Sequence, residues 1–121
     1  MSKSIIQNDH SECFICGNTR NLEEHHIFQG SNRKNSEHFG LKVKICYLCH
    51  RGNEGAHNNM YLKRELHLIG QTAFVEKYGY TKFLDVFGMN YIEAGLQEGY
   101  LYIEDGYIRG KYGLKKVRNG L

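Results

Sequence analysis

Four cysteines in this chain form two C-x-x-C pairs, Cys13 with Cys16 and Cys46 with Cys49. Each pair places two thiolates within reach of one ion, and the second pair supplies the other two corners of a tetrahedron. The spacing predicts a structural zinc site, which would contribute on the order of 10 kcal/mol of apparent folding free energy. Two disulfides or isolated buried thiols are the alternatives. An iron-sulfur centre could use the same sulfurs, but it would leave the nearby histidines unexplained.

Length and composition limit the other possibilities. At 121 residues the chain has the size of one ordinary domain. No apolar stretch approaches the roughly 20 residues of a membrane span, and the first residues lack the apolar core of a signal peptide. We therefore expect a soluble, cytoplasmic protein without a membrane partner.

The charge is distributed unevenly along the chain. The net charge of +3 is only a weak indication of an anionic partner. No acidic residue follows Asp105, however, whereas the same segment contains five basic residues: Arg109, Lys111, Lys115, Lys116 and Arg118. Such a tail could lie along phosphates, or it could simply be solvated.

The first half of the chain predicts a zinc module with two short strands. Residues 1–12 are interpreted as a loose arm. Apolar and basic residues alternate over 41–45, as in a half-buried strand, and 22–28 is predicted to be another short strand. The polar segment 30–37 between them is predicted to be a loop.

The second half predicts helices followed by a hairpin. Apolar residues follow helical spacing over 60–78, and Gly79 ends that helix. Aromatic residues then recur every fourth position, which predicts a shorter helix broken near Gly88, with its aromatic face in the core: Phe83, Phe87 and Tyr91. A tight turn at Asp105-Gly106 predicts a hairpin over 102–109. The predicted class is α+β.

Histidines are the candidates for chemistry, because no other catalytic pattern stands out. His25 and His26 are adjacent, so on a strand their side chains would point to opposite faces. One can bind a metal while the other, turned away, polarises a water molecule. A neutral imidazole with an ordinary pKa near 6.5 is suited to proton abstraction at physiological pH.

Two further histidines lie after the second cysteine pair. His50 directly follows Cys49, at the start of a short predicted helix over 46–51, and His57 lies seven residues later. In an unbroken helix that step spans about 10.5 Å, whereas two nitrogens on one ion lie within about 4 Å of each other. Joint binding therefore requires the chain to turn at its two glycines, Gly52 and Gly55. Otherwise the partner of His50 is Asn53 or Glu54 at helical spacing. The two glycines favour His57.

Together these motifs resemble a known family. Cys13-x-x-Cys16, Glu24-His25-His26-Ile27, Cys46-x-x-Cys49-His50 and His57 are similar to the HNH endonucleases, whose ββα-metal core carries a histidine base and one catalytic divalent ion. Residues 24–79 further resemble phage RecA-dependent recombination-enhancement nucleases. That span covers about half of the chain, and 96–121 has no counterpart in the resemblance.

The resemblance implies a role for each matching residue. His26 would be the general base, and His25, His50 and His57 would bind the catalytic Mg²⁺ or Mn²⁺. Asn32 and Asn35 are candidates for the asparagine that orients the base, and Glu24 could support the site or be solvated. The implied organisation is an N-terminal arm (1–12), a zinc-stabilised nuclease domain (13–95) and a C-terminal hairpin with a basic tail (96–121).

The implied reaction is metal-assisted hydrolysis of DNA phosphodiesters with weak sequence preference. Basic side chains would hold the backbone without reading bases, and the candidates are Arg33, Lys34, Lys42, Lys44, Arg109, Lys111, Lys115 and Lys116. RecA-coated DNA is a further expected partner, and the host cytoplasm is the expected location if a phage encodes the chain. The alternatives are a noncatalytic zinc module that binds DNA or protein, and a redox or iron-sulfur protein.

Overall fold

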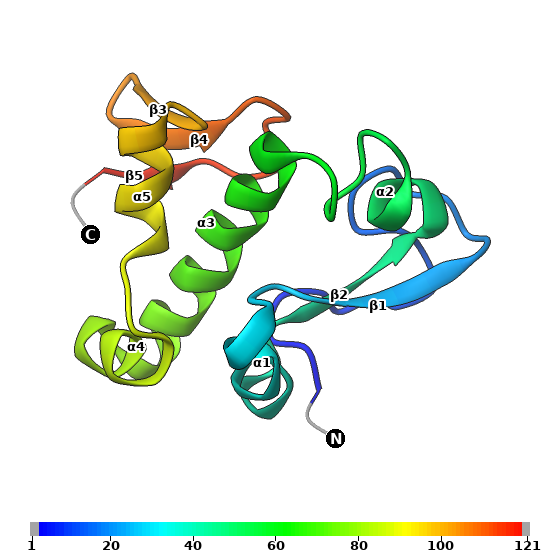
Figure 1. Ribbon diagram of the computed structural model, residues 1–121, viewed down its shortest axis with the longest axis horizontal. Coiled ribbons are helices and arrows are strands. Elements are labelled where there is room, and N and C mark those ends of the chain that lie inside the picture. Colours follow the sequence, from blue (N-terminus) through cyan, green and yellow to red (C-terminus); the bar gives the residue numbers. More distant parts are fainter. Residues whose placement is uncertain (1–2, 120–121) are drawn as a thin grey trace.

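The computed structural model describes residues 3–119 and has the predicted α+β class (Figure 1). Two small antiparallel sheets lie on either side of a long central helix, α3 (Met60–Tyr78). The first sheet, with the short helix α2 (Tyr47–Arg51), forms one side of the molecule. The second sheet and α5 (Tyr91–Glu98) form the other side.

Both strands predicted in the first half of the chain are present, and they pair as a hairpin. β1 (Leu22–His26) pairs antiparallel with β2 (Lys42–Cys46), and the register places His25 opposite Val43 and His26 opposite Lys42. Cross-strand partners lie on the same face of a sheet, and adjacent residues lie on opposite faces. The two histidines therefore point to opposite sides of this hairpin, as predicted.

The connection between these strands is not the predicted loop. It forms the 3-10 turn η1 (Gly30–Asn32) and the helix α1 (Arg33–Phe39), which ends at Gly40 in the left-handed conformation. The polar sequence has no apolar periodicity, so its helix is stabilised by tertiary contacts instead. Ser36 Oγ donates to the Phe28 carbonyl and accepts from the Phe28 amide, each at 3.0 Å. Phe39 packs edge-on against Phe74 of α3.

The described part of the N-terminal arm, from residue 3 on, is held against the first sheet although the arm was predicted to be loose; residues 1–2 lie outside the described range. The Ile5 amide donates to the Gly40 carbonyl, and Ser4 Oγ donates to the Lys42 carbonyl. Gln7 is buried, and its Oε1 accepts from the Lys44 amide at 2.7 Å. The local sequence of mixed polarity does not predict these contacts, because their partners are residues more than 30 positions away.

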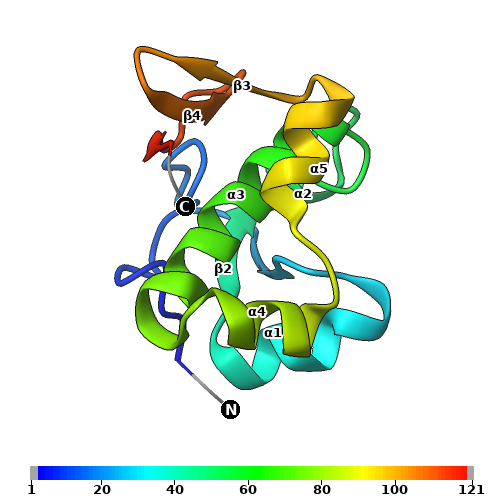
Figure 2. The same ribbon diagram turned by 90° about the vertical axis from the view of Figure 1, so that its left-hand side faces the viewer.

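The main core lies between the first sheet and the helices that follow it in the chain. α3 ends at Gly79, as predicted, and is followed by α4 (Tyr80–Phe87) and then by α5 (Figure 2). Phe83 and Phe87 are buried against Phe28, which confirms the predicted aromatic face of α4. Within residues 3–119, every helix is too short or too polar to cross a bilayer.

The C-terminal sheet contains the predicted hairpin and one further strand. β3 (Leu101–Glu104) pairs with β4 (Tyr107–Gly110), and β4 pairs with β5 (Val117–Arg118), which was not predicted. Asp105 and Gly106 have positive φ values of 53° and 81°, as a primed two-residue turn requires. The sheet has its own small core with α3 and α5, made of Leu68, Ile92, Leu101, Ile108 and Val117.

A buried carboxylate connects this sheet to α3. Glu65 is fully buried, and its two oxygens accept from the backbone amides of Tyr112 at 2.8 Å and Leu114 at 2.6 Å. Gly110 passes so close to Glu65 that an added Cβ would lie 2.3 Å from the carboxylate oxygen. The tail after β4 is therefore folded onto α3 by a side chain of α3.

Replacing this carboxylate should loosen the C-terminal sheet. Glu65→Ala leaves two amides without partners, and each buried unsatisfied group costs about 1–3 kcal/mol. We expect the free energy of unfolding, measured by urea denaturation, to fall by about 2–4 kcal/mol. Glu76→Ala, at an exposed position of the same helix, is the matched control. Equal stability of the two variants would contradict the assignment.

His67 makes the stability depend on pH. Its ring is buried and stacks on Phe28 with centroids 5.1 Å apart. Burial, together with the nearby Arg64 and Lys63 charges, lowers the pKa of His67 from 6.5 to about 3. Between these values the unfolded chain binds a proton that the folded chain rejects, so stability falls as the pH drops below about 6.5.

His67→Phe should reduce this acid sensitivity, because it removes the titrating group and keeps an aromatic ring against Phe28. One such group contributes a slope of about 1.4 kcal/mol per pH unit. In excess zinc, we expect the loss of unfolding free energy between about pH 7 and pH 5 to be about 1–2 kcal/mol smaller than in the parent. His10→Phe, at an exposed position, should keep the parental dependence, and a parental slope in His67→Phe would refute the assignment.

Candidate metal centres

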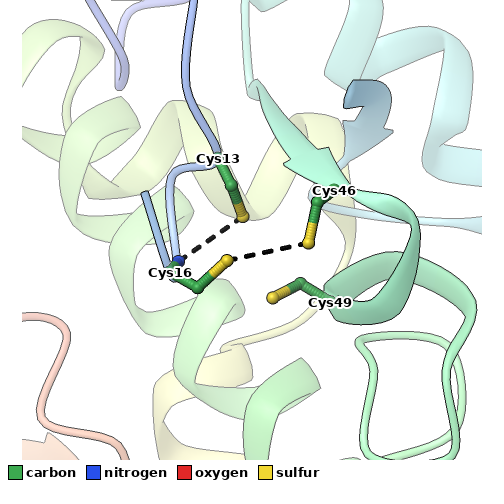
Figure 3. Close-up of side chains that lie close together, drawn as sticks. All are labelled: Cys13, Cys16, Cys46 and Cys49. Carbon is green, nitrogen blue, oxygen red and sulfur yellow. Dashed lines mark hydrogen bonds between the residues drawn. The ribbon is translucent and has the colours of Figure 1, made fainter. Parts of the chain in front are cut away.

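The four cysteines converge on one point, although they come from two distant segments (Figure 3). Cys13 and Cys16 lie in an N-terminal turn, Cys46 ends β2, and Cys49 lies in α2. Their Sγ atoms lie within 4.8 Å of one another, and those of Cys16 and Cys46 are 3.7 Å apart. Two sulfurs bound tetrahedrally at about 2.3 Å from zinc would be about 3.8 Å apart. All four thiols are free, so the cluster could hold a metal ion such as zinc.

The backbone around Cys13 supports an ionised sulfur at that position. The Cys13 amide donates to the Asn18 carbonyl at 2.7 Å, and the Cys16 amide points at Cys13 Sγ from 3.4 Å. Burial works against ionisation of Cys13, but amides including those of Cys16 and Cys46 outweigh it and lower its pKa to about 7. Burial and the neighbouring thiols raise the pKa of Cys49. One sulfur of the cluster is thus already prepared to bind a cation.

Metal content tests the assignment of the four sulfurs. We expect about one tightly bound zinc per chain, a colourless preparation, and loss of zinc with partial unfolding in Cys46→Ser, because the remaining sulfurs cannot close a tetrahedron. His50→Ala should keep this zinc and is the matched control. Zinc is measured by elemental analysis and folding by circular dichroism. A coloured, oxygen-sensitive preparation would instead indicate an iron-sulfur centre.

A second cluster consists of three imidazoles on the α2 side of the hairpin. His25 projects from β1, His50 from α2 and His57 from the loop that follows α2, and one nitrogen of each lies within 4.8 Å of the others. The Nε2 atoms of His50 and His57 are 2.7 Å apart. The ring centroid of His25 is 5.1 Å from that of His50 and 5.2 Å from that of His57. The structure therefore brings together the three histidines predicted to bind the catalytic ion.

Two glycines make this convergence possible. After α2 the chain turns back, so that the Ala56 amide donates to Cys49 O and the His57 amide donates to His50 O. An added Cβ at Gly52 or Gly55 would lie 2.6 or 2.7 Å from the Leu48 carbonyl oxygen. The predicted turn is thus present.

The electrostatics of the three imidazoles suit a cation. Burial, and then the proximity of the other two rings, lowers the pKa of His25 to about 3, and burial also lowers that of His57. Neutral rings keep the lone pairs that a metal needs. Nδ1 of His25 is buried and has no hydrogen-bond partner within residues 3–119. Three imidazoles suit zinc, nickel and other transition ions, whereas Mg²⁺ or Mn²⁺ is expected here from the family resemblance alone.

Glu23 supports this cluster, and it was not among the predicted site residues. Its Oε1 lies 2.7 Å from Nδ1 of His50 and 3.0 Å from Nε of Arg51. Metal-binding histidines commonly donate their second ring N–H to a carboxylate, which fixes the ring and directs the other nitrogen to the ion. The strand period of two places Glu23 on the same face as His25, so this residue could have been found from the sequence.

His26 occupies the opposite face, in an ionic cluster with Glu24, Glu37 and Lys42. Its Nε2 lies 2.9 Å from Glu37 Oε1 and 3.8 Å from Glu24 Oε1. Lys42 Nζ lies 2.6 Å from Glu37 Oε2 and 3.6 Å from Glu24 Oε2. Lys42 and then His26 lower the pKa of Glu37 to about 2. The two carboxylates and His26 could also contribute to a metal site, but the ammonium of Lys42 already contacts both carboxylates.

The asparagines proposed to orient His26 have other partners. Asn32 Nδ2 donates to the Phe87 carbonyl and the Tyr91 hydroxyl, and Asn35 Nδ2 donates to Asn32 Oδ1 and the Val86 carbonyl. Both fasten α1 to the end of α4. The side chain that contacts His26 is instead Glu37. This contact was not predicted, because 30–37 was expected to be a loop and only a helix places Glu37 over β1.

The basic residues predicted to contact DNA divide into two groups. Lys42 is buried and paired with Glu37, so its ammonium is not offered to a phosphate at the surface, contrary to the prediction. Arg109 is half-buried and bonds Glu104. The others lie at exposed or half-exposed positions of α1, β2 and the C-terminal tail: Arg33, Lys34, Lys44, Lys111, Lys115 and Lys116. Their role in binding stays a prediction.

Fold and sites together define a small α+β domain with one four-sulfur cluster and one three-imidazole cluster. Comparisons of the chain with protein-family models, with curated proteins and with solved structures each found no match. Function is therefore inferred from the geometry of this chain.

Proposed function

We propose that the chain is a metal-dependent endonuclease of the HNH type that hydrolyses DNA phosphodiester bonds. One observation carries the proposal: His25, His50 and His57 converge beside the four-sulfur cluster, while His26 projects from the next position of the same strand. A structural zinc with no chemistry nearby would not need a second cluster of three imidazoles.

The proposed roles follow from the contacts. The four sulfurs would hold zinc as a structural ion, and His25, His50 and His57 would hold Mg²⁺ or Mn²⁺. When bound there, the divalent ion supplies a positive charge that stabilises the phosphate and the departing 3′ oxygen. Glu23 holds Nδ1 of His50, which leaves Nε2 of His50, 2.7 Å from Nε2 of His57, available to bind an ion.

His26 is the proposed general base. With its Nε2 proton donated to Glu37, the lone pair resides on Nδ1, which can accept a proton from the attacking water. Glu37 is kept ionised by Lys42, and its charge stabilises the imidazolium that results. Cleavage would leave 5′-phosphate and 3′-hydroxyl ends.

The proposed substrate binding is largely electrostatic. Exposed basic side chains on α1 and the C-terminal tail would contact phosphates, which predicts weak sequence preference. A role in phage recombination, on DNA coated by RecA, rests only on the resemblance of residues 24–79. DNA coated by RecA is therefore one of the substrates on which cleavage is tested.

Plasmid cleavage tests the proposal. Zinc-loaded protein is incubated with supercoiled plasmid and Mg²⁺ or Mn²⁺, with and without RecA filaments. We expect nicking by the parent and a loss of at least about 100-fold in His26→Ala, because general-base catalysis contributes about 10²–10⁴-fold. His10→Ala, at an exposed position, is the control. Zinc content and circular dichroism show that the variants fold.

Binding of the second ion is measured separately. Titration calorimetry with Mn²⁺ on zinc-loaded protein should show a site that His50→Ala loses and His26→Ala keeps. Absence of cleavage by the parent under all these conditions would favour a noncatalytic zinc module instead.

A further inference from the structure

A surface cavity lies between the segment that follows the turn of Cys13 and Cys16 and the start of α2. It has a volume of about 440 Å³, within the ~300–1,000 Å³ range of small-molecule sites. Eight residues line it, and they come from both cysteine-bearing segments: Asn18, Arg20, Asn21, Leu22, Glu23, Cys46, Tyr47 and Leu48. The four-sulfur cluster therefore holds the two walls together, because it joins the same two segments.

Two apolar side chains of this cavity are unusually open to solvent. Tyr47 is 52% exposed and Leu48 is 70% exposed, although both are in the first turn of α2. A flat aromatic ring next to a hollow is a stacking surface, and base–aromatic stacking is tolerant of sequence because every base has a π face.

The polar lining offers groups suited to a nucleotide. The side-chain amide of Asn21 has no partner among the residues that the structure describes, so it can both donate to and accept from a base edge. Arg20 is exposed and makes no ion pair within residues 3–119, which leaves its guanidinium available for a phosphate. Negative charge in the lining comes from Glu23, which is balanced by Arg51.

The cavity adjoins the three-imidazole cluster. Glu23 lines the cavity and also bonds Nδ1 of His50 at 2.7 Å. The two sites thus share a side chain, and one nucleotide could place its base in the cavity and its phosphate beside the imidazoles. A paired base could not enter, because its edge and both faces are occupied within the duplex.

We propose that this cavity receives an unpaired nucleobase, stacked on Tyr47 and contacted by Asn21, beside the phosphate that is cleaved. The inference rests on the proposed nuclease function and narrows its substrate class to nucleic acid with an unpaired nucleotide: a single strand, or the unpaired part of a branched structure. The exposed basic residues then supply backbone affinity, and the cavity supplies the preference for unpaired strands.

Binding measured without catalysis tests this assignment. Fluorescence anisotropy, with no added Mg²⁺ or Mn²⁺, compares a labelled dT12 single strand with a 12-unit strand in which every base is removed. The two probes carry the same phosphates, so they differ only in what a base pocket recognises. We expect the parent to bind dT12 about tenfold more tightly, in line with the stacking contribution of one base.

Two variants locate the effect. Tyr47→Ala should bind both probes equally. Asn21→Gly should weaken dT12 several-fold without straining the backbone, because Asn21 has a positive φ of 53° that glycine adopts freely. Tyr102→Ala is the control, since Tyr102 is 41% exposed on the distant C-terminal sheet. Zinc content and circular dichroism are checked for each variant.

The outcomes separate this inference from the proposed function. A preference for dT12 that persists in Tyr47→Ala, or a parent that binds both probes equally, overturns the cavity assignment. If that parent still nicks plasmid, the nuclease proposal survives alone. A parent that binds neither probe and cleaves nothing removes both.

Discussion

The contact on which the rest of the site depends is the meeting of four sulfurs from two distant segments. Cys46 and Cys49 bracket the junction of β2 and α2, so the cluster fixes where α2 begins. His50 follows Cys49 directly, and backbone bonds from Ala56 to Cys49 and from His57 to His50 extend the constraint to the third imidazole. An ion held by the sulfurs would therefore also determine the geometry of the histidines, without touching them.

The period of two in β1 separates two environments. On one face His25 lies beside the rings of His50 and His57, where burial lowers its pKa. On the other face His26 lies among two carboxylates and one ammonium, those of Glu24, Glu37 and Lys42. The proposed roles of metal ligand and proton acceptor require such different surroundings, and adjacent strand residues provide them.

Much of this arrangement was predictable from spacing alone. The cysteine pairs, the hairpin at Asp105-Gly106, the helix ending at Gly79 and the glycine turn before His57 all follow local rules. The contact of Glu37 with His26 could not be predicted from such rules. It depends on α1, which has no apolar periodicity and is stabilised by the buried Ser36 and by Phe39. The burial of Lys42 could not be predicted for the same reason, because its partner Glu37 lies on that helix.

Residues 96–121 have no counterpart in the family resemblance, yet the described part of this segment, 96–119, is joined to the same framework. The Tyr112 amide and the Leu114 amide bond the buried Glu65 of α3, and the Tyr112 hydroxyl meets Asn59, which caps α3 directly after the His57 loop. Lys111 lies over the Tyr61 ring at 5.2 Å. The start of α3 thus connects the imidazole cluster to the basic tail. Because these contacts fix the tail against the start of α3, they also fix where its basic side chains lie relative to the three imidazoles.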